Sequence, residues 1–380
     1  MKLLKDKKIA IVGGGPGGLT LARLLQMNGA DVTVYERNAH KDARPQGASL
    51  DLHDEAGLLA LKEAGLMDPF NANYRPGADQ LRIADKDGRV VFDDHSGGQN
   101  DRSRPEIDRG PLQHILLQSL SPDTVVWDSQ FVNMTPSIGG WQLNFKNGLS
   151  AYADLVVAAD GANSKIRPYL TSIKPFYSGV TAIEGAINCS KTQSPQIHKI
   201  LNGGKIFAFG DCKSLIVSSK GDGSLVFYTS FKCSYNWVDQ SNIDFSKKIQ
   251  VSNWFKQSYS NWDNIWLELF ENAHGPFIPR PLYCMPPDQT WKAQPNLTIL
   301  GDAAHLMPPF AGEGVNMAML DALELSQCLL NDGQDMPTAI ESYEIQMRVR
   351  ASEIAKQTLQ NTDLLHSPAA IEFILSVMQG

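Results

Sequence analysis

Apolar and polar positions near the start of the chain follow a pattern that predicts a β-α-β unit. Four consecutive apolar residues, Ile9 to Val12, predict a buried parallel strand. A glycine-rich turn follows, and Leu19 to Asn28 then carries apolar residues at helical spacing until Gly29 ends the pattern. Asp31 to Tyr35 predicts a second strand, which Glu36 follows directly. We therefore expect a parallel sheet to start in this region.

Two further apolar strands later in the chain are each followed by a loop that contains glycine. Asp154 to Ala159 leads into Asp160-Gly161, and Leu297 to Leu300 leads into the loop Gly301 to Asn316. Between them, from about Tyr177 to Met285, alternating stretches predict a section rich in β-strands. Because the carboxyl ends of parallel strands share one edge of a sheet, the three loops favour a common ligand crevice over separate structural turns.

The end of the chain is predicted to be helical. Met336 to Gln379 carries apolar residues at helical spacing, and Ser367-Pro368 predicts a break. Earlier, Lys86 to Gly88 lies between two short apolar stretches and predicts a hairpin turn. The pattern as a whole favours an α/β fold that includes a sheet-rich section.

Composition narrows the class of protein. The net charge of −7 over 380 residues argues against a nucleic-acid-binding protein, whose surface would be basic. The five cysteines are scattered and favour reduced thiols over a disulfide framework or a metal site. No stretch reaches the roughly eighteen apolar residues that span a bilayer. We expect a cytoplasmic monomer that binds no metal, no membrane and no nucleic acid.

The first glycine-rich turn has the spacing of a dinucleotide-binding loop, with Gly13, Gly15 and Gly18 in the pattern G-x-G-x-x-G. The first glycine allows the tight turn, the second lets the backbone approach a pyrophosphate, and the third lets the helix pack closely on the strand. Glu36 follows about twenty residues later, where a carboxylate accepts hydrogen bonds from ribose hydroxyls. Such a pattern alone could be a structural loop, but the flanking strands and the acid favour a bound dinucleotide.

Three motifs together resemble the fingerprints of the FAD-dependent aromatic hydroxylases, the para-hydroxybenzoate hydroxylase family. They are Gly13 to Gly18 with Glu36-Arg37, then Asp160-Gly161, and finally Gly301 to His305 with Pro308-Pro309 and Gly312 to Asn316. Their order and spacing cover nearly the whole chain. Within the family, the tetracycline-inactivating flavin monooxygenases are the most similar branch, through Tyr35 to Arg37, Leu50 to His53, Val126 to Asp128 and His305 to Ala311.

The resemblance implies a Rossmann-like FAD-binding domain, a β-sheet-rich substrate-binding domain and a long C-terminal helix. The expected boundaries are residues 1–72, 101–174 and 288–332 for the FAD-binding domain, 73–100 and 175–287 for the substrate-binding domain, and 333–380 for the C-terminal bracing helix.

The resemblance also implies the cofactors FAD and NADPH. In its terms Glu36 holds the adenosine ribose, while Arg109 and Asp302 hold the ribityl and pyrophosphate portion of FAD. Asp160-Gly161 is associated with both cofactors, and Arg44 with NADPH, although Arg44 could equally be a solvated loop residue. The implied cofactor-binding residues are Gly13, Gly15, Gly18, Glu36, Arg37, Arg44, Asp51, Arg109, Asp160, Gly161, Asp302, Gly312, Gly314, Val315 and Asn316.

The implied activity is monooxygenation of an aromatic or polycyclic phenolic substrate. NADPH reduces the flavin, O₂ adds to it, and the flavin hydroperoxide hydroxylates the substrate, so no protein side chain is expected to be catalytic. His305 could act as a general base, but a structural role in its loop is favoured. Gly312 to Asn316 begins a helix whose dipole would stabilise negative charge on the reduced ring, and Glu313 stands where the branch commonly has Gln.

Substrate contacts are expected from the sheet-rich section. In the tetracycline-inactivating branch Gln, Arg and His hold the polar face of the drug, and the spacing places Glu184, Lys205 and Val226 at those positions. Phe207, Met307 and Phe310 would form an apolar platform, unless they are ordinary core residues.

Tetracycline inactivation is the leading specific activity that follows from this resemblance. The alternatives are a monooxygenase of another phenolic or polyketide compound, a flavin dehydrogenase that transfers no oxygen, and a regulator that retains FAD without turnover. A flavin-dependent halogenase is disfavoured, because its W-x-W-x-I-P motif is absent from the sequence.

Overall fold

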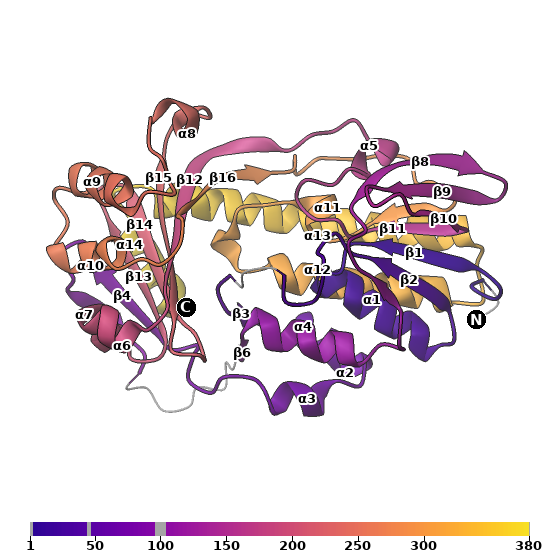
Figure 1. Ribbon diagram of the computed structural model, residues 1–380, viewed down its shortest axis with the longest axis horizontal. Helices are drawn as coiled ribbons and strands as arrows, with labels where there is room; N and C mark the ends of the chain where they lie inside the picture. Colours follow the sequence, from indigo (N-terminus) through magenta and orange to yellow (C-terminus); the bar gives the residue numbers. More distant parts are fainter. Residues whose placement is uncertain (1–2, 44–46, 96–103, 380) are drawn as a thin grey trace.

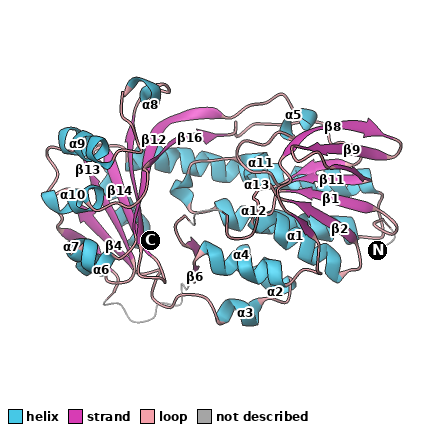
Figure 2. Cartoon of the chain, viewed as in Figure 1, coloured by secondary structure: helices cyan, strands magenta, loops and turns pink. Residues whose placement is uncertain are grey.

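Two sheets at opposite ends of the molecule organise the chain in the computed structural model, which describes residues 3–43, 47–95 and 104–379 (Figure 1). Arg44 lies outside the described residues. Helices pack against both sheets, and a small set of further strands lies beside the five-stranded one, as the colouring of Figure 2 shows. The predicted α/β fold class, with a sheet-rich part and a long C-terminal helix, is confirmed.

A parallel five-stranded sheet forms one end, in the strand order β17-β11-β1-β2-β7. Its strands are short apolar runs because both faces are covered. Helix α1 packs on β1 and β2, while a small three-stranded sheet contacts β1 and β11. The strand bounds are Lys8–Val12 (β1), Asp31–Tyr35 (β2), Val125–Val126 (β7), Leu155–Ala158 (β11) and Leu297–Ile299 (β17), and in the small sheet Phe131–Ser137 (β8), Gly140–Phe145 (β9) and Ser150–Ala153 (β10).

The loops after β1, β11 and β17 meet at one edge of the five-stranded sheet, as predicted from the sequence. Val12 pairs with Ala158, and Ala158 pairs with Ile299, so the three strands end side by side. We call this the loop edge, made of Gly13 to Gly18, Asp160-Gly161 and Gly301-Asp302. Helix α12 starts near it and packs along α1.

A seven-stranded sheet forms the other end, in the order β16-β12-β15-β14-β13-β4-β5. The predicted hairpin at Lys86 to Gly88 is confirmed, since it joins β4 to β5. The bounds are Leu81–Asp85 (β4), Val90–Asp93 (β5), Phe176–Ile187 (β12), Lys205–Gly210 (β13), Lys213–Ser219 (β14), Leu225–Lys232 (β15) and Ile278–Cys284 (β16), with β3 (Leu50–Asp51) and β6 (Glu106–Ile107) forming a separate pair.

The two faces of the seven-stranded sheet differ in what covers them. Residues of alternate positions, such as Ile206, Val217 and Phe227, are buried with side chains of α7, α9 and α10. The opposite face carries Lys205, Phe207, Val226, Tyr228 and Glu184. The strand register shows this, because Lys205 and Val226 both pair with Ser218, and Phe207 and Tyr228 both pair with Ile216. Glu184 pairs with Tyr228. We call this second surface the inner face.

The C-terminal helices connect the two ends of the molecule. Helix α13 spans Met336–Leu365, and α14 spans Ala370–Gln379, so the predicted break at Ser367-Pro368 is confirmed. Figure 1 shows α13 running from the five-stranded sheet towards the seven-stranded one. It packs against α12, and just beyond its end His366 Nε2 lies 2.7 Å from Ser230 Oγ on β15.

The remaining helices are shorter than the long helices that cross the molecule. Those beside the five-stranded sheet are Pro16–Met27 (α1), Gly57–Glu63 (α2), Met67–Asn71 (α3), Arg109–Gln118 (α4), Arg167–Leu170 (α5), Asp302–His305 (α11), Pro309–Ala311 (η2) and Gly314–Leu330 (α12). Those beside the seven-stranded sheet are Ser190–Gln193 (α6), Pro195–Leu201 (α7), Trp237–Gln240 (α8), Lys248–Ser258 (α9), Asn264–Trp266 (η1) and Leu267–Glu271 (α10). Within the described residues, no helix is both long and apolar enough to cross a membrane.

Buried apolar residues form three separate clusters, and the predicted domains with their boundaries stay a prediction. One surrounds the five-stranded sheet, a second lies between the seven-stranded sheet and its helices, and a third lies between the inner face and α14. Strand β12 spans Phe176–Ile187, at the start of the section that is predicted to be rich in strands.

Candidate cofactor and substrate site

Close backbone contacts require glycine at Gly13 and at Gly18 in the first loop. Gly13 has a φ of +115°, and a Cβ there would lie 2.1 Å from the Ala159 carbonyl oxygen. A Cβ on Gly18 would lie 2.1 Å from the Gly13 carbonyl oxygen. A Cβ on Gly15 would instead meet no heavy atom within 4 Å, which leaves space for a phosphate to approach the backbone. The loop therefore fits a dinucleotide.

Glu36 is held in place at the end of β2. Its carboxylate is buried, with Oε2 accepting a hydrogen bond from Gly14 N at 2.6 Å and Oε1 accepting one from Asn38 N at 2.9 Å. Each carboxylate oxygen has a second lone pair, so this fixed group can also accept from ribose hydroxyls. Arg37, the next residue, is exposed.

Asp160 offers an unsatisfied oxygen at the loop edge. Its Oδ2 accepts a hydrogen bond from Lys165 N at 2.8 Å, whereas Oδ1 is buried and has no hydrogen-bond partner among the described residues. Burial raises the pKa of this carboxyl. Gly161 has a φ of +80° and open space around its Cβ position. A bound cofactor with a donor group at this point would satisfy the Asp160 oxygen.

Asp302 and Arg109 are brought together electrostatically, although they are far apart in the sequence. Asp302 begins α11 and reaches solvent. The surrounding protein nevertheless desolvates its carboxyl and so raises the pKa, while the positive charges of Arg109 and Arg167 act to lower the pKa. Arg109 Nε donates to Ala48 O at 3.0 Å. The buried Arg167 joins the loops, since its guanidinium donates to Ala303 O at 2.6 Å and to Asp302 O at 3.0 Å.

The start of α12 is fastened to the segment after β3. Asn316 is fully buried, its Nδ2 donates to Asp51 O at 3.0 Å, and its Oδ1 accepts from His53 N at 2.9 Å. Gly312 has a φ of +73°, and a Cβ there would lie 3.7 Å from Asp51 Oδ2. Gly314 has open space at its Cβ position, and Val315 is half-buried. The predicted residues Asp51, Gly312, Gly314, Val315 and Asn316 are therefore close neighbours.

His53 stands between two carboxylates at this junction. Its Nε2 lies 3.2 Å from Asp51 Oδ2 and its Nδ1 lies 3.4 Å from Glu313 Oε1, and only 3% of its side chain is exposed. Burial acts to lower the pKa of His53, but the two carboxylates outweigh it and raise the pKa to about 9. The imidazole is therefore protonated at neutral pH. In turn, burial would raise the pKa of Asp51, but its bond to His53 and the charge of Lys205 lower it.

The predicted substrate residues share the inner face, but its charged members are already paired. Lys205 Nζ forms an ion pair with Glu106 Oε1, and Glu184 Oε2 forms one with Arg280 Nε. Ser49 Oγ also donates to Glu106. Burial raises the pKa of Glu106, although Lys205 opposes this effect. These partners were not predicted, because nothing in the local sequence links β6 to β13.

Tyr228 marks where the inner face approaches the loops of the other sheet. Its hydroxyl accepts a hydrogen bond from Ala48 N at 3.4 Å. Burial raises the pKa of this phenol, and Glu184 adds to the shift. Tyr228 belongs to the candidate site and was not predicted, although it lies two residues after Val226 and therefore on the same side of β15.

Phe207 and Phe310 pack on one apolar cluster below α14. Both contact a group that includes Ile83, Phe209 and Ile374. The ring of Phe310 lies 5.1 Å from that of His366. Met307 is half-buried in the same loop as Phe310. Phe207 on β13 and Phe310 in η2, two residues of the predicted platform, thus pack against the same cluster.

His305 has a structural role in the described structure. Its Nε2 lies 2.6 Å from Asp321 Oδ2, and Asp321 Oδ1 accepts from Arg350 Nη2 at 2.7 Å. Asp321 also accepts from Gly301 N at 2.8 Å. Burial would lower the pKa of His305, but Asp321 raises it. This buried network fixes the third loop against α12 and α13.

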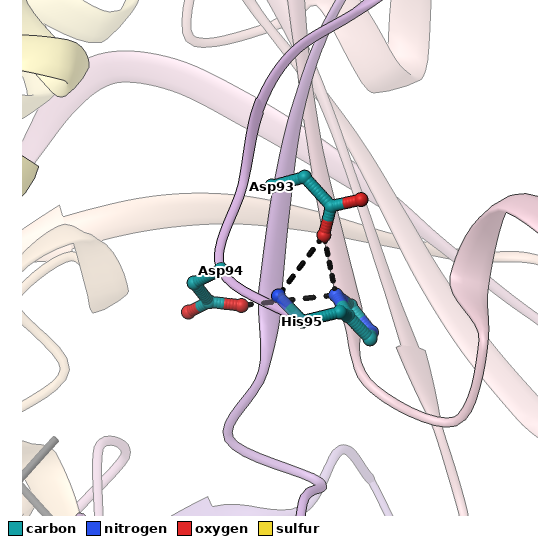
Figure 3. A group of neighbouring side chains, drawn as sticks. All are labelled: Asp93, Asp94 and His95. Carbon is teal, nitrogen blue, oxygen red and sulfur yellow. Dashed lines mark hydrogen bonds and ion pairs between the residues drawn. The ribbon is translucent and has the colours of Figure 1, made fainter. Parts of the chain in front are cut away.

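A separate acidic group lies at the end of β5. Asp93, Asp94 and His95 bring their ligand atoms within 4.8 Å of one another (Figure 3). Asp93 Oδ1 lies 2.9 Å from His95 Nδ1, and Asp94 Oδ1 accepts from Leu81 N at 2.6 Å. These contacts account for the cluster without an ion, so it carries no functional assignment.

Comparison with known proteins agrees with the geometry of the loops. The model of a family described as FAD binding domain matches residues 6–105 and 289–360. Monooxygenase asqM of Emericella nidulans is 30% identical, with 98% of each chain covered. The chain belongs to the FAD-dependent monooxygenases. The similarity to asqM thus covers both sheets, and the predicted family is confirmed.

Solved structures support the fold of this FAD-dependent monooxygenase. Klebsiella pneumoniae HpxO, solved with FAD and uric acid, has a TM-score of 0.78 at 20% identity and covers 99% of this chain and 92% of its own. The tetracycline destructase Tet(51) has a TM-score of 0.71 at 18% identity, with 98% of this chain and 95% of that chain covered. These two likenesses show that the monooxygenase has a known architecture, and they concern the fold alone.

Proposed function

We propose that this FAD-dependent monooxygenase uses NADPH and O₂ to hydroxylate an aromatic or polycyclic phenolic compound. One observation carries the proposal. The inner face reaches the segment before β3 through the contact between Tyr228 and Ala48, and Ala48 also accepts a hydrogen bond from Arg109, a proposed FAD-binding residue. This contact supports the placement of the inner face opposite the proposed cofactor site. A flat apolar substrate between the two surfaces would lie next to the cofactor.

The residues of this chain bind and orient, while bound FAD supplies the redox and oxygen-transfer chemistry. Gly13 to Gly18 and Glu36 would hold the adenosine diphosphate portion, and Asp302 and Arg109 the ribityl chain. The amino end of α12 presents unpaired N–H groups that favour negative charge on the ring. Asp160 and Gly161 are proposed to contact NADPH as well as FAD. The sheets on either side limit access of water to the reacting atoms.

Tetracycline is the specific substrate that we propose to examine first. Its polar face needs hydrogen-bond partners, yet Glu184 and Lys205 are engaged with Arg280 and Glu106, and Val226 offers none. Each missing contact to a buried polar group costs about 1–3 kcal/mol. We therefore expect turnover of tetracycline with a high KM, and tighter binding of a phenolic or polyketide compound that has fewer polar groups.

A screen of NADPH consumption tests the proposal. Tetracyclines and a panel of phenolic compounds are added to the FAD-bound enzyme, and NADPH absorbance and O₂ uptake are followed together. We expect at least one compound to stimulate both rates in parallel above the rate without substrate. A dehydrogenase would instead be identified if an added compound stimulated NADPH oxidation without O₂, with an artificial electron acceptor as the sole oxidant.

A further inference from the structure

The start of α12 carries an unusual concentration of charge for a position beside a flavin. Asp51 and Glu313 each contact one nitrogen of His53, at 3.2 and 3.4 Å. Two carboxylates and one imidazolium leave this group with one net negative charge. Three other charged side chains of the described residues act on it. Arg104 Nη1 lies 3.9 Å from Asp51 Oδ2, the charge of Lys205 acts on Asp51, and Glu106, the ion-pair partner of Lys205, also interacts electrostatically with Asp51.

This charged group adjoins the place where the FAD ring would lie. In the proposed function the pyrophosphate lies at the open backbone of Gly15, at the loop edge. Helix α12 packs on the same loop, since a Cβ on Gly17 would lie 2.7 Å from Ala318 O. Gly312 lies close to Asp51, and Gly314 near it has open space at its Cβ position. The amino end of α12 and the carboxylates of Asp51 and Glu313 are therefore neighbours. Adding electrons to a flavin here adds negative charge near Asp51 and Glu313.

An uncompensated carboxylate at this point would oppose reduction. The N–H groups of α12 favour negative charge on the ring, whereas Glu313 acts in the opposite direction. A partner with a positive charge offsets the effect of the Glu313 carboxylate and leaves the effect of the helix in place. His53 is nearly fully buried, so its charge is weakly screened by solvent.

We propose that His53 is a positioning residue that neutralises one carboxylate of the Asp51–Glu313 pair and thereby raises the reduction potential of bound FAD. His53 touches neither substrate nor the reacting atoms. It acts through Glu313 and Asp51, whose side chains it orients from between them. This proposal rests on the placement of FAD in the proposed function and is independent of the substrate.

A double-mutant cycle tests the proposal on the FAD-bound protein without any turnover. The reduction potential is measured by spectroscopic titration against redox dyes at pH 7 in the wild type, His53→Gln, Glu313→Gln and the double variant. His53→Gln leaves two net negative charges and should lower the potential, whereas Glu313→Gln leaves none and should raise it. Each single change is expected to alter the equilibrium constant for two-electron reduction about tenfold, which corresponds to about 30 mV.

The double variant separates charge compensation from a structural role. It restores one net negative charge, so its potential should return to that of the wild type. The proposal would be overturned if His53→Gln and the double variant lowered the reduction potential equally while Glu313→Gln left it unchanged. If His53→Gln does not retain FAD, Glu313→Gln alone decides, because an unchanged potential there contradicts the proposal. Loss of FAD from all four proteins would instead contradict the proposed cofactor site.

Discussion

Lys205, on the inner face of the seven-stranded sheet, forms an ion pair with Glu106, a carboxylate without exposed surface in the other part of the molecule. The contact joins β13 of the seven-stranded sheet to the separate β3–β6 pair. The resemblance had implied that Lys205 holds the substrate. Its engagement with Glu106 makes it a structural link as well, and stability therefore depends on it.

Lys205→Met should destabilise the protein strongly. Breaking a buried ion pair by removing one partner typically costs about 3–5 kcal/mol, because the other charge is left uncompensated. Adding Glu106→Leu should recover most of that loss, since apolar replacement of both partners is close to neutral. Urea denaturation of the two variants measures this. A single variant as stable as the wild type would show that the pair contributes nothing.

Asp302→Ala should weaken FAD binding without unfolding the protein. The side chain is exposed at the loop edge, so its loss leaves no cavity. A lost hydrogen bond to a charged group costs about 1.5–3 kcal/mol, equivalent to roughly a ten- to hundredfold rise in Kd. Fluorescence titration of the apoprotein with FAD provides the measurement. Asp288→Ala, at another exposed aspartate, is the matched control and should leave Kd unchanged.

Val226→His should lower the KM for tetracycline. The substitution adds a hydrogen-bonding group to the inner face, and binding shared by the ground state and the transition state appears in KM more than in kcat. We expect up to about a tenfold decrease in KM, from about 1.4 kcal/mol of added binding. Lys205→Arg keeps the ion pair with Glu106 and adds the forked N–H donors of a guanidinium. The double variant, Lys205→Arg with Val226→His, should therefore lower KM further. An unchanged KM would exclude this part of the face from drug binding.

The contribution of His53 to stability should depend on pH. Its folded pKa of about 9 lies above the unfolded value, so the stabilisation is fully present below about pH 6.5 and is lost as the pH rises through about 9. His53→Gln should therefore reduce the unfolding free energy by on the order of 2–3 kcal/mol at pH 6 and by much less at pH 9.5. Thermal denaturation across this range tests the sign. His114→Gln, at an exposed histidine of α4, should show no such trend.

The loops of the cofactor site were predictable because their signals are local. An apolar strand, a glycine turn and a helix lie consecutively in the sequence, and parallel pairing alone brings Gly13, Asp160 and Asp302 to one edge. The position of Glu184, Lys205 and Val226 on one face follows likewise from strand alternation.

The charge pairing within the site could not be predicted in the same way. Glu106 and Lys205 come from distant segments, and only the tertiary fold shows that they meet. His53 was part of a recognised motif, but its partner Glu313 belongs to a different loop. The sequence places Glu313 at the start of a helix, but only the structure shows its contact with the protonated His53.

Isotopic labelling tests the central claim, that this chain is an NADPH-dependent monooxygenase of a phenolic compound. The FAD-bound enzyme is supplied with NADPH, ¹⁸O₂ and the most stimulating compound of the panel, and the product is analysed by mass spectrometry. The account predicts one ¹⁸O atom in the product for each substrate molecule consumed, with one NADPH oxidised. A product without ¹⁸O, or NADPH oxidation that yields only hydrogen peroxide for every compound, would contradict it.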